Sequence, residues 1–161
     1  ILSELFGNVR DHSRSPIPGY IAVQRYKGYP GRYGYGGVEP HIQTIVSDSG
    51  LGITGTLKPI VEERYPEIFG KLDLTDPKAD PLLVYEVFKN GRISQSLEEG
   101  RGLGLKRSGD VAASYNAIIS VREGGFEIKL SYKAGELDKA NYRIDLPKLM
   151  GTHICFDFVL A

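Results

Sequence analysis

Hydrophobic and polar residues recur along this chain with two different periods, and each period predicts one type of element. Apolar residues at helical spacing near the N-terminus predict an amphipathic helix over residues 1–12. The pattern also predicts three more helices, over residues 56–69 with a break at Pro66, 82–89 and 103–115. Runs with strand-like character predict six strands, over residues 19–26, 40–47, 117–123, 125–132, 140–146 and 152–160.

The order of these elements predicts the fold class. Strands alternate with helices in the early part of the chain and follow one another directly in the later part. With no internal repeat and no domain-length linker, this order predicts an α+β fold, a two-layer α/β sandwich whose mixed, mostly antiparallel sheet carries helices on one face. Residues 1–161 are expected to form a single domain. Because the first helix begins without an N-cap residue, we expect a fragment that lacks its N-terminal elements.

The composition narrows the classes of function. Lys and Arg together number 20, as do Asp and Glu, so the formal net charge is zero and gives no reason to expect nucleic acid or an anionic membrane as a partner. No apolar run approaches the roughly 20 residues of a transmembrane helix, and a single cysteine excludes an internal disulfide. These features predict a cytoplasmic protein. Glycine is about twice as frequent as average, and it clusters in the predicted turns and loops, over residues 27–37, 48–55 and 92–102.

A first group of candidate functional residues lies in the N-terminal helix. Steps of four residues put Glu4, Asn8 and His12 on one polar face, each a turn above the last. A carboxylate and an amide oxygen in this arrangement can hold Mg²⁺, or a water bound to it, beside a phosphate, and the carboxylate can take a proton from an attacking water. The alternative is the solvent-facing side of an ordinary surface helix.

A second group follows the second strand and reads Asp48-Ser-Gly50-Leu-Gly52-Ile53. A carboxylate at the C-terminal end of a strand can accept the exocyclic amino hydrogen of adenine, whereas guanine presents a carbonyl oxygen there and is repelled. Gly50 and Gly52 would leave room for the base and the ribose. One alternative is a plain Asp-Gly turn. Another is a dinucleotide fingerprint, because the segment also fits G-x-G-x-x-G, but the buried parallel strand that this fingerprint needs does not follow.

The third motif opens the helix predicted over residues 103–115 and reads Gly100-Arg-Gly102-Leu103-Gly104-Leu. Backbone N–H groups at a helix N-terminus favour anions, and a triphosphate is the obvious candidate. The alternative is a flexible loop capped by a helix. A fourth motif, Gly151-Thr152, precedes the last strand and carries weight only together with the other three.

Taken together, the four motifs resemble those of the Bergerat-fold ATPases, the superfamily of sensor histidine kinases, anti-sigma serine kinases, Hsp90, MutL and the gyrase B subunit. The N box of that superfamily is similar to Glu4-Leu-Phe-Gly-Asn8-Val-Arg-Asp-His12-Ser13. Its two glycine boxes are similar to residues 48–53 and 100–105, and its final Gly-Thr pair to residues 151–152. The resemblance covers nearly the whole chain, and it implies the Bergerat α/β sandwich and binding of ATP with Mg²⁺.

The resemblance also implies a role for each residue that matches a motif. Asn8 would hold Mg²⁺, and Glu4 would be the catalytic carboxylate that activates water or accepts a proton. Asp48 would bind the adenine amino group, and Thr152 would support Asp48 and a bound water. The segment Arg92–Arg101 would belong to the ATP lid. The other nucleotide-binding positions that the boxes imply are His12, Gly50, Gly52, Ile53, Gly100, Gly102, Leu103 and Gly104.

Three functions fit this resemblance. The first is the ATP-binding domain of a signalling or regulatory protein, related to histidine or serine protein kinases, whose phosphoryl acceptor lies on another domain or protein. The second is an ATP-driven clamp of the Hsp90 or MutL type, and the third is a non-enzymatic ATP sensor whose lid changes the affinity for a protein partner. The chain contains no helical dimerisation segment with a phospho-acceptor histidine, so full histidine-kinase activity is not expected from it alone. Residues 56–90 form a longer segment than a minimal kinase domain needs and are a candidate partner surface.

Overall fold

A computed structural model describes residues 16–28, 39–70, 72–73, 75–90 and 104–160 of the chain. Six strands in this part form one sheet in the order β1-β2-β6-β3-β4-β5. The strands are β1 (Tyr20–Tyr26), β2 (His41–Ser47), β3 (Ala117–Gly124), β4 (Phe126–Lys133), β5 (Glu136–Arg143) and β6 (Leu149–Val159). The described helices are α2 (Gly52–Arg64), α3 (Pro66–Phe69), α4 (Ala79–Asn90) and α5 (Gly104–Ser114).

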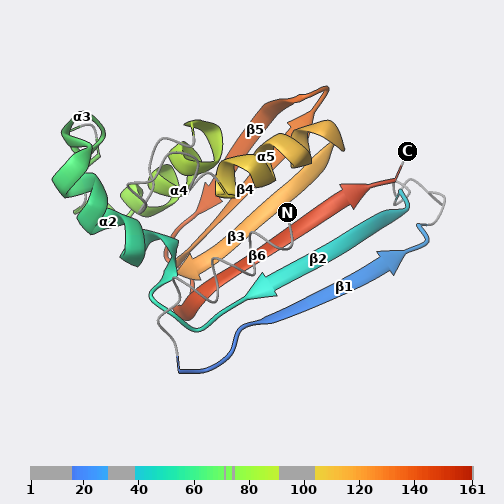
Figure 1. Ribbon diagram of the computed structural model, residues 1–161, viewed down its shortest axis with the longest axis horizontal. Helices are drawn as coiled ribbons and strands as arrows, with labels where there is room; N and C mark the ends of the chain where they lie inside the picture. The colour runs from blue at the N-terminus through green and yellow to red at the C-terminus, as the bar shows by residue number, and fades with distance from the viewer. Residues whose placement is uncertain (1–15, 29–38, 71, 74, 91–103, 161) are drawn as a thin grey trace.

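The sheet and the helices form two layers. Figure 1 shows α4 and α5 lying over the part of the sheet that contains β3, β4 and β5, with α2 beside the end where β3 finishes and β6 begins. All neighbouring strands among the described residues pair antiparallel, so the prediction of a mixed sheet is wrong for this part of the chain. The predicted α+β class, with helices against one face of a mostly antiparallel sheet, is confirmed.

The main core lies between α4, α5 and the central strands. Side chains alternate between the two faces of a strand, and in β3 and β4 one face is almost fully buried while the other stays partly exposed. Fully burying one such aliphatic or aromatic side chain contributes about 1.5–3 kcal/mol. The core residues of β3, β4 and β6 and of the two helices include Ala117, Ile119, Val121, Phe126, Ile128, Leu130, Ile154, Phe156, Val84, Phe88 and Ala112.

Two helices begin earlier than the sequence predicted. Helix α2 starts at Gly52 rather than at residue 56, and it ends at Arg64 just before the predicted break at Pro66. Helix α4 starts at Ala79 rather than at residue 82, although the sequence predicted a loop up to Pro81. Proline is tolerated in the first helical turn because its missing N–H would have no partner there.

Strand β5 also begins earlier than predicted, at Glu136 rather than at residue 140. Ala134 and Gly135 both have positive φ, +52° and +88°, as a tight two-residue hairpin turn requires, so pairing with β4 resumes at once. The strand lies at a sheet edge and is mostly exposed, which removes the hydrophobic alternation that would have revealed it. The predicted helix over residues 1–12 lies outside the described residues, as do most of the predicted loops over 27–37 and 92–102.

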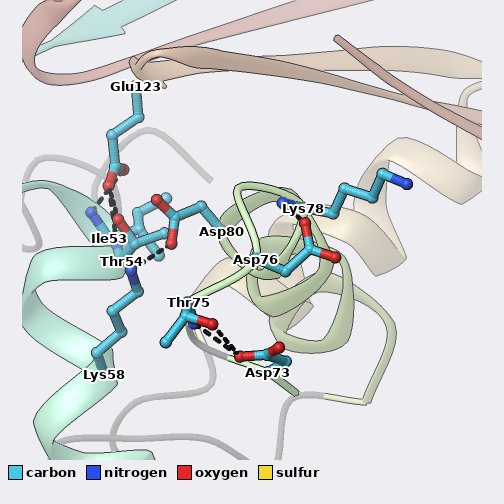
Figure 2. Close-up of polar contacts among 9 residues, drawn as sticks. All are labelled: Ile53, Thr54, Lys58, Asp73, Thr75, Asp76, Lys78, Asp80 and Glu123. Atoms are coloured by element: carbon cyan, nitrogen blue, oxygen red, sulfur yellow. Dashed lines mark hydrogen bonds and ion pairs between the residues drawn. The ribbon is translucent and has the colours of Figure 1, made fainter. Parts of the chain in front are cut away.

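Helices α2 and α4 are joined by a polar contact and by apolar packing. Figure 2 shows Lys58 of α2 directed at Asp80 in the first turn of α4, where Nζ and Oδ1 are 2.5 Å apart. A carboxylate in the first turn of a helix is also favoured by the helix dipole. Leu57 and Val61 pack against Leu83 and Val87 in a second apolar cluster. Helix α4 is thus packed against the sheet on one side and against α2 on another.

Candidate functional site

The turn that follows β2 is fixed by hydrogen bonds at both ends. The backbone N–H of Asp48 donates to the carbonyl oxygen of Thr152 in β6, at an N···O distance of 3.0 Å. Asp48 Oδ1 accepts the N–H of Gly50 at 2.7 Å, an interaction that closes the turn in the way typical of aspartate. Among the described residues, none donates a hydrogen bond to Asp48 Oδ2.

Gly151 lets β6 pass very close to this turn. Its φ is +76°, a conformation that residues with a side chain rarely adopt. A Cβ placed on Gly151 would lie 2.6 Å from Cα of Ser49 and 2.6 Å from the carbonyl carbon of Asp48. Two of the predicted motifs, Asp48–Ile53 and Gly151-Thr152, are therefore in direct backbone contact.

Helix α2 begins inside the glycine-rich motif and has no local N-cap. Leu51 precedes it without a side-chain hydrogen bond, and the first turn contains no acidic residue. The cap comes instead from β3. Glu123 Oε2 accepts the N–H of Ile53 at 2.7 Å, and Oε1 accepts the N–H of Thr54 at 2.9 Å, as Figure 2 shows. A carboxylate satisfies the free N–H groups of a helix N-terminus and is stabilised by the helix dipole.

Two hydroxyl groups complete the surroundings of the Glu123 carboxylate. Thr54 Oγ1 donates to Oε1, and Thr152 Oγ1 donates to Oε2 at 3.3 Å. Only 4% of Glu123 is exposed, so its carboxylate is shielded from water. Burial raises the pKa of Glu123, and the hydrogen bonds from Thr54, Ile53 and Thr152 oppose that rise without cancelling it.

Gly52 is required for this contact on two grounds. Its φ is +80°, and a Cβ on it would lie 2.5 Å from Cδ of Glu123. The sequence suggested that the missing side chain leaves room for a base and a ribose. In the structure that space is filled by the Glu123 carboxylate.

The occupied N-terminus of α2 decides against the dinucleotide fingerprint. That fingerprint puts a pyrophosphate at the N-terminus of a helix that follows a parallel strand. Here the carboxylate of Glu123 already takes the N–H groups, and β2 has antiparallel neighbours on both sides. The segment from Gly50 to Gly55 is therefore not a dinucleotide-binding motif.

Arg122 forms hydrogen bonds near the end of β3, on the face opposite Glu123. It is adjacent to Glu123 in β3, so its side chain leaves the opposite face of the strand. Its Nη2 donates to the carbonyl oxygen of Pro147, in the segment that leads into β6. Its Nη1 lies within hydrogen-bond distance of three more carbonyl oxygens in the β3–β4 connection, those of Glu123 at 3.2 Å, Gly124 at 2.7 Å and Phe126 at 2.8 Å.

The starts of α2 and α5 meet the same part of the core. Ile53, in the first glycine box, is partly buried against both apolar clusters. Leu105, which follows Gly104 at the start of α5, packs against the same two clusters. The described end of the second glycine box is therefore linked to the first box through shared packing.

The remaining predicted site residues lie outside the described part of the chain, namely Glu4, Asn8, His12, Gly100, Gly102 and Leu103. The predicted lid over Arg92–Arg101 lies outside it as well. Among the described residues, no group of three or more His, Cys, Asp or Glu side chains is arranged to hold a metal ion. The Mg²⁺ site at Asn8 therefore stays a prediction.

Two features of the site were not anticipated. The backbone carbonyl of Thr152 accepts the N–H of Asp48, and its hydroxyl group donates to Glu123. Glu123 itself was missed, although the sequence carried a signal for it. Ala117, Ile119 and Val121 alternate on the buried face of β3, and the next position on that face is a glutamate. A charged residue in a buried register requires polar partners, here at the start of α2.

No family model matches the chain, and neither a curated protein nor a solved structure is significantly similar to it. None of the described helices combines the length and apolar character needed to cross a membrane.

Proposed function

We propose that this chain is the ATP-binding domain of a signalling or regulatory protein, and that it uses ATP with Mg²⁺ as a phosphoryl donor or ATPase substrate. The observation that supports this proposal best is the direct contact between two of the four nucleotide motifs. Asp48 and Thr152 are far apart in the sequence, yet a backbone hydrogen bond of 3.0 Å joins them. The bond continues the pairing of β2 with β6, where Ser47 lies opposite His153, and this neighbourhood supports the Bergerat arrangement, in which such motifs line one ATP pocket.

Asp48 has the hydrogen-bonding character that adenine requires. Its Oδ1 accepts the N–H of Gly50 at 2.7 Å, which restrains the side chain. A carboxylate oxygen only accepts hydrogen bonds, so it matches the exocyclic amino group of adenine and repels the carbonyl oxygen that guanine carries there. Selectivity for ATP over GTP follows from this single side chain.

The phosphates would bind away from α2, because Glu123 already occupies the N-terminus of that helix. The other glycine-rich motif leads into α5, whose first residue is Gly104, and backbone N–H groups at a helix start suit an anion. Asn8 would hold Mg²⁺, as the resemblance implies. When bound, Mg²⁺ supplies charge neutralisation for phosphoryl transfer.

Calorimetric titration of ATP and GTP into the wild type and Asp48→Asn tests the proposal. The asparagine keeps an oxygen for the N–H of Gly50 but puts an NH₂ donor in place of Oδ2. A donor then faces the adenine amino group, so we expect ATP affinity to fall about 10- to 100-fold. GTP should bind weakly to the wild type and gain relative to ATP in the variant. A wild type that binds neither nucleotide, or a variant that binds ATP as well as the wild type, would contradict the assignment of the pocket.

The reaction is tested separately, with γ-labelled ATP and candidate acceptor proteins. Transfer of the label to a protein acceptor supports a kinase role, and release of phosphate alone supports an ATPase role. Glu4→Ala should abolish either turnover while leaving ATP affinity within about threefold, because a residue that acts only in the transition state contributes to the rate rather than to binding. ATP binding without any turnover would instead favour the sensor function.

A further inference from the structure

We infer that Glu123 is a positioning residue of the nucleotide site, which couples the start of α2 to β6 and thereby fixes the orientation of Asp48. The nucleotide part of this inference rests on the proposed function, whereas the structural coupling does not. Glu123 belongs to none of the nucleotide motifs, yet it lies between two of them. Its carboxylate contacts α2 at Ile53 and Thr54, and β6 at Thr152.

The contacts form a closed path around the turn after β2. Starting from Glu123, the path passes to the Thr152 hydroxyl at 3.3 Å, then from the Thr152 carbonyl to the N–H of Asp48 at 3.0 Å. From Asp48 it continues through the hydrogen bond to Gly50 at 2.7 Å and along the backbone to Ile53. Ile53 returns to Glu123 at 2.7 Å. Each link is a hydrogen bond or a run of covalent bonds, and the Glu123 carboxylate closes the path between β6 and α2, so we expect the position of Asp48 to depend on this carboxylate.

Removal of this carboxylate has two consequences for ligand recognition. The N–H groups of Ile53 and Thr54 lose their partner in a buried place, so the first turn of α2 is expected to loosen. The same N–H groups also become free to attract an anion, since a helix N-terminus binds phosphate. A nucleotide would then bind with its phosphates in more than one position, and the choice of base would matter less.

The variant that tests the coupling is Glu123→Gln, which has nearly the same shape. Each carboxylate oxygen accepts one backbone N–H, from Ile53 or from Thr54. In the glutamine the NH₂ group replaces one of these oxygens, so a donor faces a donor at that position. Thr54→Val is a milder second variant, because it removes only the Thr54 hydroxyl that donates to Glu123. Lys58→Met is the matched control. It breaks the contact to Asp80 further along α2 and leaves the Glu123 carboxylate with all its donors.

The first readout is amide hydrogen exchange without any nucleotide. In Glu123→Gln we expect exchange at Ile53 and Thr54 to become at least about tenfold faster, and the increase to extend to the N–H of Asp48. Lys58→Met should leave the Asp48 amide unchanged. If the exchange at Asp48 stays at the wild-type rate in Glu123→Gln and in Thr54→Val, the coupling is absent and the inference is overturned.

The second readout is the ratio of the Kd values for ATP and GTP, at a temperature where all variants are folded. A role limited to stability would lower both affinities alike and keep the ratio. A positioning role predicts that the preference for ATP falls about tenfold in Glu123→Gln and about threefold in Thr54→Val, with no change in Lys58→Met. If the wild type prefers ATP and the variants keep the same ratio of Kd values, the positioning role is refuted. If the wild type binds no nucleotide, the proposed function fails, and the exchange measurement still decides the coupling.

Discussion

At the scale of single residues, glycines set how closely segments approach at this site. Gly151 combines a φ of +76° with a backbone neighbour on the side where a Cβ would lie. Gly135, in the β4–β5 turn, has a similar φ of +88° but open space around its Cβ position. The pair therefore separates the cost of an unfavourable backbone angle from the cost of a steric clash.

We expect Gly151→Ala to lower the free energy of unfolding by about 3 kcal/mol, because a strained φ costs about 1 kcal/mol and an overpacked site about 1–3 kcal/mol more. Gly135→Ala should cost only about 1 kcal/mol. Urea unfolding of both variants and the wild type measures the difference. Equal losses in the two variants would mean that the close approach of β6 to the Asp48 turn is not tight.

The sequence made Asp48 and Thr152 candidates because each belongs to a short, contiguous motif. It did not identify Glu123, whose partner Ile53 is 70 residues away in the chain. When the carboxylate that caps a helix comes from a distant strand, the residues around the start of that helix do not reveal it. The contact between the Thr152 hydroxyl and Glu123 joins residues that are likewise far apart in the sequence.

At the scale of elements, the end of β3 contacts a different segment on each of its two faces. Glu123 holds the start of α2 on one face of the strand, and Arg122 holds the segment before β6 on the other. The guanidinium of Arg122 lies within hydrogen-bond distance of four carbonyl oxygens. A flat group with five N–H donors can serve several acceptors at once, and a lysine ammonium cannot copy that geometry.

We expect Arg122→Met to lower the free energy of unfolding by about 2–3 kcal/mol, because hydrogen bonds to a charged group contribute about 1.5–3 kcal/mol. Arg122→Lys should recover less than half of that loss. The matched control is Arg143→Met, which removes a largely exposed arginine from its pair with Glu127 and should cost no more than about 1 kcal/mol. Chemical denaturation compares the three variants, and a loss for Arg122→Met as small as that for Arg143→Met would contradict this role.

The elements themselves were predictable where burial leaves a periodic pattern. Strands β3 and β4 alternate buried and partly exposed positions along their whole length, and both were identified nearly to the residue. Strand β5 is an exposed edge without hydrophobic alternation, so its start after the Ala134-Gly135 turn was not recognised. Helix α2 obtains its N-cap from β3, so its start depends on a tertiary contact that a local pattern does not contain.

At the scale of the whole molecule, the site lies where two apolar clusters meet. One cluster joins α4 and α5 to the sheet, and the other joins α2 to α4. Ile53 packs against both clusters, and its N–H is held by Glu123. A buried carboxylate is thus placed between two apolar regions, where its protonation is coupled to the stability of the entire fold.

This placement predicts how stability depends on pH. Burial raises the pKa of Glu123 in the folded protein above the ordinary glutamate value of 4.5, so the folded state holds the proton more tightly than the unfolded state. The stabilisation from this group is therefore complete below pH 4.5 and is lost as the pH rises through the folded pKa. Glu123→Gln cannot titrate, and other groups titrate alike in both proteins.

We therefore expect the free energy of unfolding of the wild type to fall relative to that of Glu123→Gln as the pH rises from 4 to 8. Denaturant unfolding at several pH values in this range measures that difference, and Lys58→Met, which does not change the contacts of the carboxylate, should show no such trend. If the wild type instead gains stability relative to Glu123→Gln with rising pH, the four hydrogen bonds to Glu123 lower its pKa by more than burial raises it.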